Sequence, residues 1–179
     1  MRIAQFQGIS IESRAIKFLT RSRYSHSAWV FDEQTVKAID LVESAGVLLN
    51  KLNWRTPGAV VEAWDTGVRN VASISEQHTP GTVVDIFDYS IPLTLTEEME
   101  LVKLLNGDIG DKYGFLNVIR FVTRRPGNLD KSWFCSELVF QRSLDIGRRM
   151  LNNTLAWEVP PGWIPRSTLL NPTFKRVMT

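Results

Sequence analysis

The sequence predicts an α+β fold in which an antiparallel β-sheet is packed with helices. Short apolar runs of strand length gather in the first half of the chain, and segments with helical caps lie before and after them. Strands and helices do not alternate as they would in a parallel sheet. With 179 residues, 44% of them apolar, the chain is expected to form a single domain over residues 1–179.

The expected strands are apolar runs bounded by turn residues, and they cover residues 3–6, 27–31, 59–64, 68–71 and 83–88. Asp-Thr-Gly and Thr-Pro-Gly sequences form the turns before the last two of these runs. Residues 34–58, between the second and third strands, fit a helix only loosely. They are interpreted as an insert of one helix and a loop at the sheet edge.

Cap signals place the expected helices. Ser10 can cap a helix that continues to Thr20, and Thr94 with Glu97 makes a capping box for a helix that ends near residue 107. Further helices are expected over residues 115–121 and 135–146, the latter closed by Gly147. Residues 157–165 are rich in proline and tryptophan and are expected to be irregular.

The charge is nearly balanced, with 21 Lys and Arg against 19 Asp and Glu and a net charge of +2. A basic group, Arg120, Arg124, Arg125 and Lys131, has no interleaved aromatic pattern and is interpreted as a solvated helix end and loop, so no nucleic-acid partner is expected. No stretch approaches the roughly 18 apolar residues that a membrane span needs. The start of the sequence does not resemble a signal peptide, and a cytoplasmic location is expected.

The chain has one cysteine, Cys135, at the opening of a predicted helix. A thiol there faces unpaired backbone N–H groups and the positive end of the helix dipole, which favour the reactive thiolate. A single cysteine excludes an internal disulfide and a multi-cysteine zinc site. The common alternative for such a residue is a small apolar side chain in the core.

Two histidines and two glutamates are the further candidates for cysteine chemistry. His26 opens a buried strand, whereas His78 lies in a polar loop and is expected to be solvated and uninvolved. Glu62 lies among apolar residues, and a buried carboxylate needs a partner such as an imidazolium. Glu43 is a competing carboxylate that is expected on a helix surface. Cys135, His26 and Glu62 therefore form a candidate set of nucleophile, base and orienting carboxylate.

Three segments resemble, in their order, the motifs of one family. Residues 23–28 (Arg-Tyr-Ser-His-Ser-Ala) resemble its histidine motif, residues 60–68 its polar-residue strand, and residues 133–139 (Trp-Phe-Cys-Ser-Glu-Leu-Val) its cysteine helix. The family is the circularly permuted NlpC/P60 group of papain-like enzymes, the YiiX-like amidases and peptidases. In this branch the histidine precedes the cysteine, as it does here.

The resemblance implies a permuted papain-like fold and catalytic roles for Cys135, His26 and Glu62. It implies acyl transfer from an amide, ester or thioester, with the oxyanion held by backbone N–H groups at the helix start and with no metal or organic cofactor. Tyr113 resembles a recurring tyrosine of the family and is a candidate for lining the substrate-binding cleft; a plain core tyrosine is an equal alternative. The long segment 34–58 keeps Glu43 open as the third residue, although the motif that follows Glu62 favours Glu62.

Three functions remain open at this stage. The leading hypothesis is a cysteine amidase or peptidase that cleaves an amide bond in a small-molecule, peptide or peptidoglycan-like substrate. The second is a lipid acyltransferase or thioesterase with the same fold. The third is a non-catalytic binding or assembly module of a phage or mobile element. The sequence does not identify the substrate or the oligomeric state.

Overall fold

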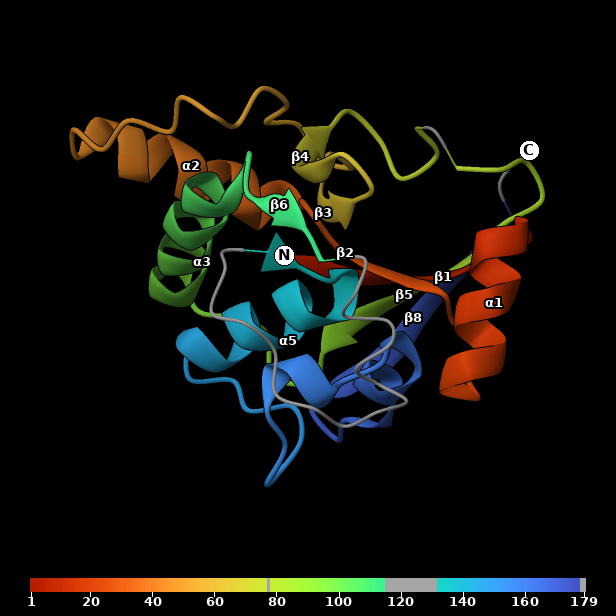
Figure 1. Ribbon diagram of the computed structural model, residues 1–179. Helices are drawn as coiled ribbons and strands as arrows, with labels where there is room; N and C mark the ends of the chain where they lie inside the picture. The colour runs from red at the N-terminus through yellow and green to blue at the C-terminus, as the bar shows by residue number, and fades with distance from the viewer. Residues whose placement is uncertain (77, 115–131, 178–179) are drawn as a thin grey trace.

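The computed structural model describes residues 1–76, 78–114 and 132–177. These residues form a six-stranded sheet in the order β4-β3-β2-β1-β5-β8, in which every neighbouring pair is antiparallel (Figure 1). The strands are β1 (Arg2–Gln7), β2 (His26–Val30), β3 (Val60–Trp64), β4 (Gly67–Val71), β5 (Val83–Tyr89) and β8 (Leu170–Val177). The predicted α+β class is confirmed, and the first five strands coincide with the predicted apolar runs within one or two residues.

The helices are α1 (Ile11–Thr20), α2 (Glu33–Ser44), α3 (Leu95–Asp108) and α5 (Cys135–Asp145). The predicted caps are present: the Ser10 side chain accepts from the backbone N–H of Ser13, and Thr94 with Glu97 forms the capping box of α3. The predicted helix over residues 115–121 and the basic group from Arg120 to Lys131 lie outside the described residues.

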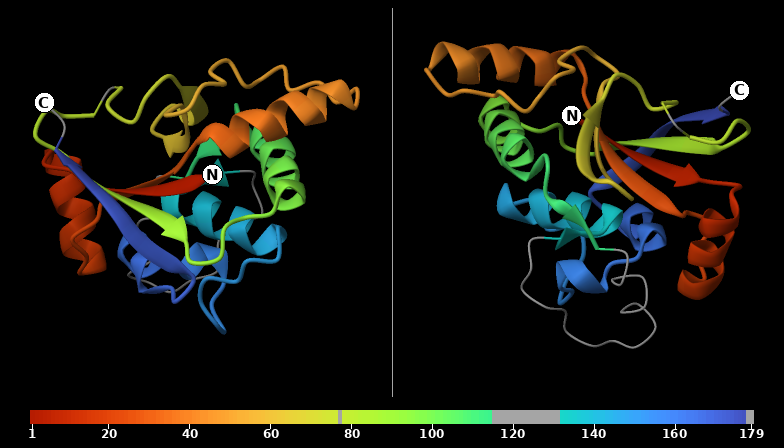
Figure 2. Two further views of the ribbon diagram at one scale, coloured as in Figure 1. Left: turned by 180° about the vertical axis from the view of Figure 1, so that it is seen from behind. Right: turned by 45° about the horizontal axis from the view of Figure 1, so that its top comes forward.

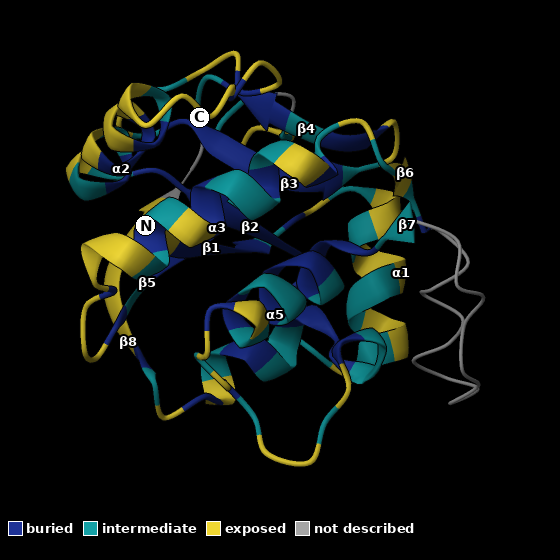
Figure 3. Cartoon of the chain, turned by 90° about the vertical axis from the view of Figure 1, so that its left-hand side faces the viewer, coloured by how far each residue is buried: buried dark blue, intermediate teal, exposed yellow. Residues whose placement is uncertain are grey.

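The two faces of the sheet carry different clusters of buried side chains. Side chains such as Ile3, Trp29 and Val61 join the main core with residues of α2, α3 and α5, and these helices lie together against the sheet (Figure 2). Alternate positions, such as Ala4 and Val60, form a second, smaller cluster. Figure 3 shows how completely the central strands are buried. This burial explains why their sequences read as nearly continuous apolar runs.

Residues 34–58 form most of α2 and the loop that follows it, as predicted. Asp32 and Thr35 form a capping box at the start of α2, and the helix packs against α3. Ile39 and Leu52 are fully buried in the main core, so the segment is integrated into the fold. Whether it is an insertion relative to the NlpC/P60 family stays a prediction.

The prediction of irregular structure over residues 157–165 is wrong in part. Short 3₁₀ helices cover Ala156–Glu158 and Pro161–Arg166. The second can begin at Pro161 because proline fits the first turn of a helix, where its missing N–H is not needed. The edge strand β8 was not predicted. Its Pro172 pairs with Phe87 beside a register shift in β5, and edge strands with irregularities are where a sheet tolerates proline.

Candidate functional site

The candidate site lies where β2 and β3 separate. The register of these two strands covers only Trp29 with Val61 and Val30 with Val60, so it stops short of His26 on one strand and Glu62 on the other. Helix α5 contacts both strands. Because the ladder is missing at this end, side chains from the two strands can meet each other beside the helix.

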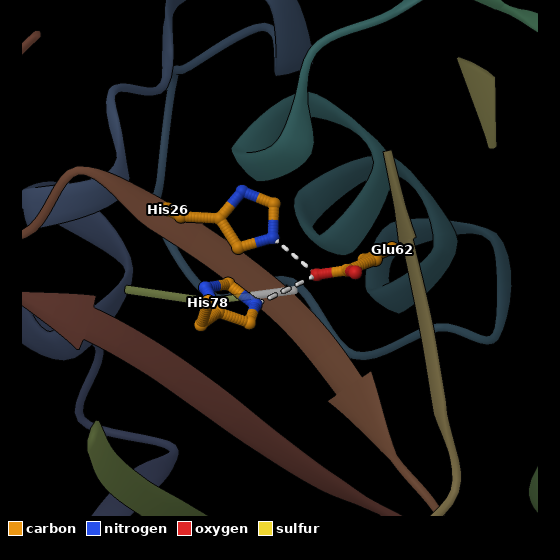
Figure 4. Close-up of side chains that lie close together, drawn as sticks. All are labelled: His26, Glu62 and His78. Atoms are coloured by element: carbon orange, nitrogen blue, oxygen red, sulfur yellow. Dashed lines mark hydrogen bonds and ion pairs between the residues drawn. The ribbon is translucent and has the colours of Figure 1, made fainter. Parts of the chain in front are cut away.

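The side chains of Glu62 and His26 meet across this gap in a buried contact. The His26 Nε2 lies 2.7 Å from the Glu62 Oε2, and Glu62 is only 1% exposed (Figure 4). Burial alone would raise the pKa of the Glu62 carboxyl, but hydrogen bonds from His26 and His78 outweigh it and hold that pKa well below its usual range. Glu62 is therefore a carboxylate at neutral pH.

Arg69 completes the environment of this carboxylate. It lies directly opposite Glu62 in the β3–β4 pair, and its Nε and Nη2 donate to the Glu62 Oε1 at 2.9 and 2.6 Å. The guanidinium carbon also lies 4.3 Å from the ring centre of Trp64. One carboxylate oxygen is thus held by the arginine, and the other faces the histidines.

The β3–β4 turn ties this pair to the start of α5. Gly67 has φ +121°, and a Cβ there would lie 2.6 Å from the carbonyl oxygen of Asp111, so the turn needs glycine. The same carbonyl accepts the N–H of Val68 at 2.8 Å. Directly after it, β6 (Lys112–Tyr113) pairs in parallel with β7 (Ser132–Trp133), two residues before Cys135.

His78 is part of the site, so the expectation that it is solvated and uninvolved is wrong. Its side chain is 7% exposed, and its Nε2 lies 3.4 Å from the Glu62 Oε2. Its ring stacks on Phe6 with centres 4.2 Å apart and forms a T-shaped contact with Trp64 with centres 4.7 Å apart. The polar neighbours of His78 in the sequence gave no signal of this packing, since its apolar partners come from β1 and β3.

The protonation of His26 follows from its surroundings. Burial lowers the pKa of His26, and the hydrogen bond and charge of Glu62 offset this only in part. The imidazole is thus neutral at rest, with its Nε2–H donated to Glu62. Within the described part of the chain, the Nδ1 of His26 makes no hydrogen bond, and Figure 4 shows this nitrogen turned away from Glu62. It is free to accept a proton.

Cys135 is the first residue of α5, as predicted, and is 1% exposed. Burial raises the pKa of its thiol to about 12, although the backbone N–H groups of Ser27 and Ser136 act to lower it. The expectation of a resting thiolate is therefore wrong, because desolvation outweighs the helix start. Among the described residues the sulfur makes no hydrogen bond with His26, so the predicted contact of nucleophile and base stays a prediction.

The start of α5 is suited to hold an anion. Phe134 occupies the N-cap position and offers no side-chain oxygen that could compete for the first N–H groups of the helix. The carboxylate of Glu137 instead accepts the N–H of Phe134 at 3.2 Å. The Ser136 hydroxyl donates to the Val159 carbonyl at 2.6 Å, which fixes the first turn. The N–H groups beside the sulfur can therefore serve an oxyanion.

The remaining candidates are placed as follows. Tyr113 is partly buried against the main core, and its ring centre lies 5.9 Å from that of Phe134. Phe134 is the N-cap of α5, so this contact places the tyrosine near the helix start, and burial raises the pKa of Tyr113. Glu43 lies on α2, 36% exposed at its side chain, and accepts two hydrogen bonds from Arg55 at 2.7 and 2.8 Å. The structure brings Glu62, and not Glu43, to His26.

Comparisons with known proteins show the class of fold. No protein-family model matches the chain, and no curated protein matches its sequence. A solved structure described as the metalloprotein YiiX of Escherichia coli O157:H7, DUF1105, superposes with a TM-score of 0.67. The two chains are 16% identical, and the match covers 98% of this chain and 96% of that one. The fold is therefore YiiX-like, and the NlpC/P60 assignment stays a resemblance of sequence motifs.

The described residues contain no helix with the length and apolar character needed to cross a bilayer.

Proposed function

We propose that this protein is a cysteine hydrolase of the amidase or peptidase type, with Cys135 as nucleophile, His26 as base and Glu62 as the carboxylate that orients the base. The observation that carries the proposal is the 2.7 Å contact between His26 Nε2 and the buried Glu62 Oε2, beside the helix that begins at the chain's one cysteine. A carboxylate in this place fixes the tautomer in which Nδ1 is the acceptor.

The proposed reaction starts from a neutral thiol and a neutral imidazole. As the sulfur attacks the carbonyl carbon, the thiol proton passes to the Nδ1 of His26, and Glu62 stabilises the imidazolium that forms. The backbone N–H groups at the start of α5 receive the oxyanion. The imidazolium then protonates the leaving amine, and water releases the acyl group from the sulfur.

Substrate binding has to complete the arrangement. Cys135 is 1% exposed, so neighbouring side chains must move before a carbonyl carbon can reach the sulfur. The sulfur must also approach His26 to within hydrogen-bond reach. Catalytic hydrogen bonds are often long or absent in a free enzyme and form only in the complex.

The proposal can be tested with nitrophenyl esters, whose activated acyl group reports a nucleophile of unknown specificity. We expect nitrophenyl acetate to leave an acetyl group on Cys135, visible by mass spectrometry, and to turn over slowly. Cys135→Ser should abolish the adduct, and Glu62→Gln should slow turnover more than Glu43→Gln. A folded protein that forms no adduct would refute the hydrolase and favour the binding or assembly module.

The same assay separates the two enzymatic alternatives. An amidase or peptidase should prefer the acetyl ester and cleave small amides or peptidoglycan-like peptides. A lipid acyltransferase or thioesterase should instead prefer long acyl chains, because a long chain adds apolar contacts in the binding groove. Because a protein of similar fold is described as a metalloprotein, each rate is best measured with and without a chelator.

A further inference from the structure

We propose that His26, Glu62 and His78 form a binding site for a divalent transition metal ion. The three residues come from β2, β3 and the loop after β4, and each directs a donor atom to the same place (Figure 4). All three donor atoms lie within 4.8 Å of one another. Nothing in the local sequence pattern brings these residues together.

The spacing is close to what a metal requires. In a tetrahedral zinc site with bonds of about 2.05 Å, the ligand atoms lie about 3.3 Å apart. The His78 Nε2 and Glu62 Oε2 are already 3.4 Å apart. The His26 Nε2 and Glu62 Oε2, at 2.7 Å, would have to separate by about 0.6 Å, which a small rotation of the ring supplies.

The surroundings hold the ligands in place. His78 stacks on Phe6, and both imidazole rings form T-shaped contacts with Trp64, with ring centres 5.2 Å apart for His26 and 4.7 Å apart for His78. Arg69 donates two hydrogen bonds to the Oε1 of Glu62, and the Oε2 of the same carboxylate faces the two histidines. Such outer contacts orient metal ligands and sharpen affinity.

The donor set selects the class of metal. Two imidazole nitrogens and one carboxylate oxygen suit Zn²⁺, Co²⁺, Ni²⁺ or Cu²⁺, whereas Mg²⁺ and Ca²⁺ prefer oxygen donors. Among the described residues, the carboxylate of Glu62 already forms an ion pair with Arg69, so a bound metal would add positive charge beside an existing cation. An anionic fourth ligand, such as hydroxide or a substrate carboxylate, is therefore favoured.

Metal binding has a consequence that rests on the proposed function. The metal would use the Nε2 of His26 and the Oε2 of Glu62, the same atoms that fix the catalytic tautomer. With Nε2 bound to metal, the neutral imidazole carries its proton on Nδ1 and cannot accept one from Cys135. A bound zinc ion should therefore inhibit the hydrolase.

The binding itself is tested by competition for Zn²⁺ with a chromogenic chelator and by the visible absorption of the Co²⁺ form. We expect one metal ion per chain, and an affinity reduced about tenfold or more in His78→Phe, which keeps the stacked ring, and in Glu62→Gln. Glu43→Gln and Cys135→Ser should bind as the unmodified protein does. Circular dichroism identifies any variant that fails to fold. If only one of His78→Phe and Glu62→Gln folds, that variant is sufficient to test the site.

Three outcomes would overturn the site: no binding by the unmodified protein, equal affinity in the ligand variants, or loss of binding in Cys135→Ser. Inhibition is measured with nitrophenyl acetate, each protein against its own metal-free rate, and Zn²⁺ should inhibit His78→Phe less strongly. Zinc binding without inhibition would refute the proposed inhibition of the hydrolase, whereas the metal site itself would stand. Metal binding by a protein that forms no acetyl adduct would leave the site and refute the hydrolase.

Discussion

The rate at which Cys135 is alkylated in the native protein shows whether its side chain is a neutral thiol or a thiolate before substrate binds. Burial raises the pKa of this thiol from an ordinary value of 9.0 to about 12. A raised pKa removes thiolate at every pH below it, so the thiolate fraction at neutral pH is about a thousandfold lower than that of an ordinary thiol. Because only the thiolate reacts with iodoacetamide, native Cys135 should alkylate at least about a thousandfold more slowly than Cys135 in the unfolded chain.

The assay follows alkylation by mass spectrometry between pH 6 and pH 10, in buffer and in concentrated urea. We expect the native rate to rise about tenfold per pH unit over the whole range, whereas the unfolded protein levels off near its ordinary pKa. His26→Ala should change the native rate little, because the imidazole does not hold the thiolate at rest. Fast native labelling at pH 6 that His26→Ala abolishes would reveal a thiolate–imidazolium pair and refute the reasoning from burial.

Three further predictions concern stability. Glu62→Gln removes the charge of a fully buried carboxylate that pairs with His26 and Arg69, and should lower the free energy of unfolding in urea by about 3 kcal/mol, against less than about 1 kcal/mol for Glu43→Gln, where the carboxylate is partly exposed; equal losses would contradict the assigned burial of Glu62. The pKa of Glu97 is lowered from an ordinary 4.5 to about 2, mainly by a hydrogen bond from Arg148. This pair therefore stabilises the fold above pH 4.5, and its contribution is lost as the pH falls towards 2. Solvent screening limits that contribution to about 1 kcal/mol, and the destabilisation by Arg148→Ala in thermal melts should vanish at low pH; a loss that persists there would argue against the pair. Gly67→Ala should cost about 2 kcal/mol in urea unfolding, because its φ of +121° and the close carbonyl both oppose a side chain; a neutral effect would show that the turn relaxes.

Local patterns determined much of the fold. The first five strands follow apolar runs between turn residues, and the caps at Ser10 and Thr94 mark where α1 and α3 begin. These features depend on a few neighbouring residues, so the sequence alone is sufficient to predict them. The same reasoning placed Cys135 at a helix start and Glu62 in a buried strand, where both are found.

Other features depend on residues far apart in the chain. The strand β8 forms because β5 offers it an edge to pair with, and its own sequence, interrupted by Pro172, carries little strand signal. His78 enters the site because Phe6 and Trp64 pack against its ring, although its sequence neighbours are polar.

The sequence by itself determined which residues could perform cysteine chemistry, and only the tertiary structure decided their protonation and their partners. A helix start acts on a thiol through adjacent backbone groups, and that effect is visible in the sequence. The desolvation that makes Cys135 a neutral thiol comes instead from packing across the whole core. Likewise, Glu62 is shared by His26, His78 and Arg69 because three separate segments converge on it. Burial and long-range convergence are properties of the folded chain, and no local pattern encodes them.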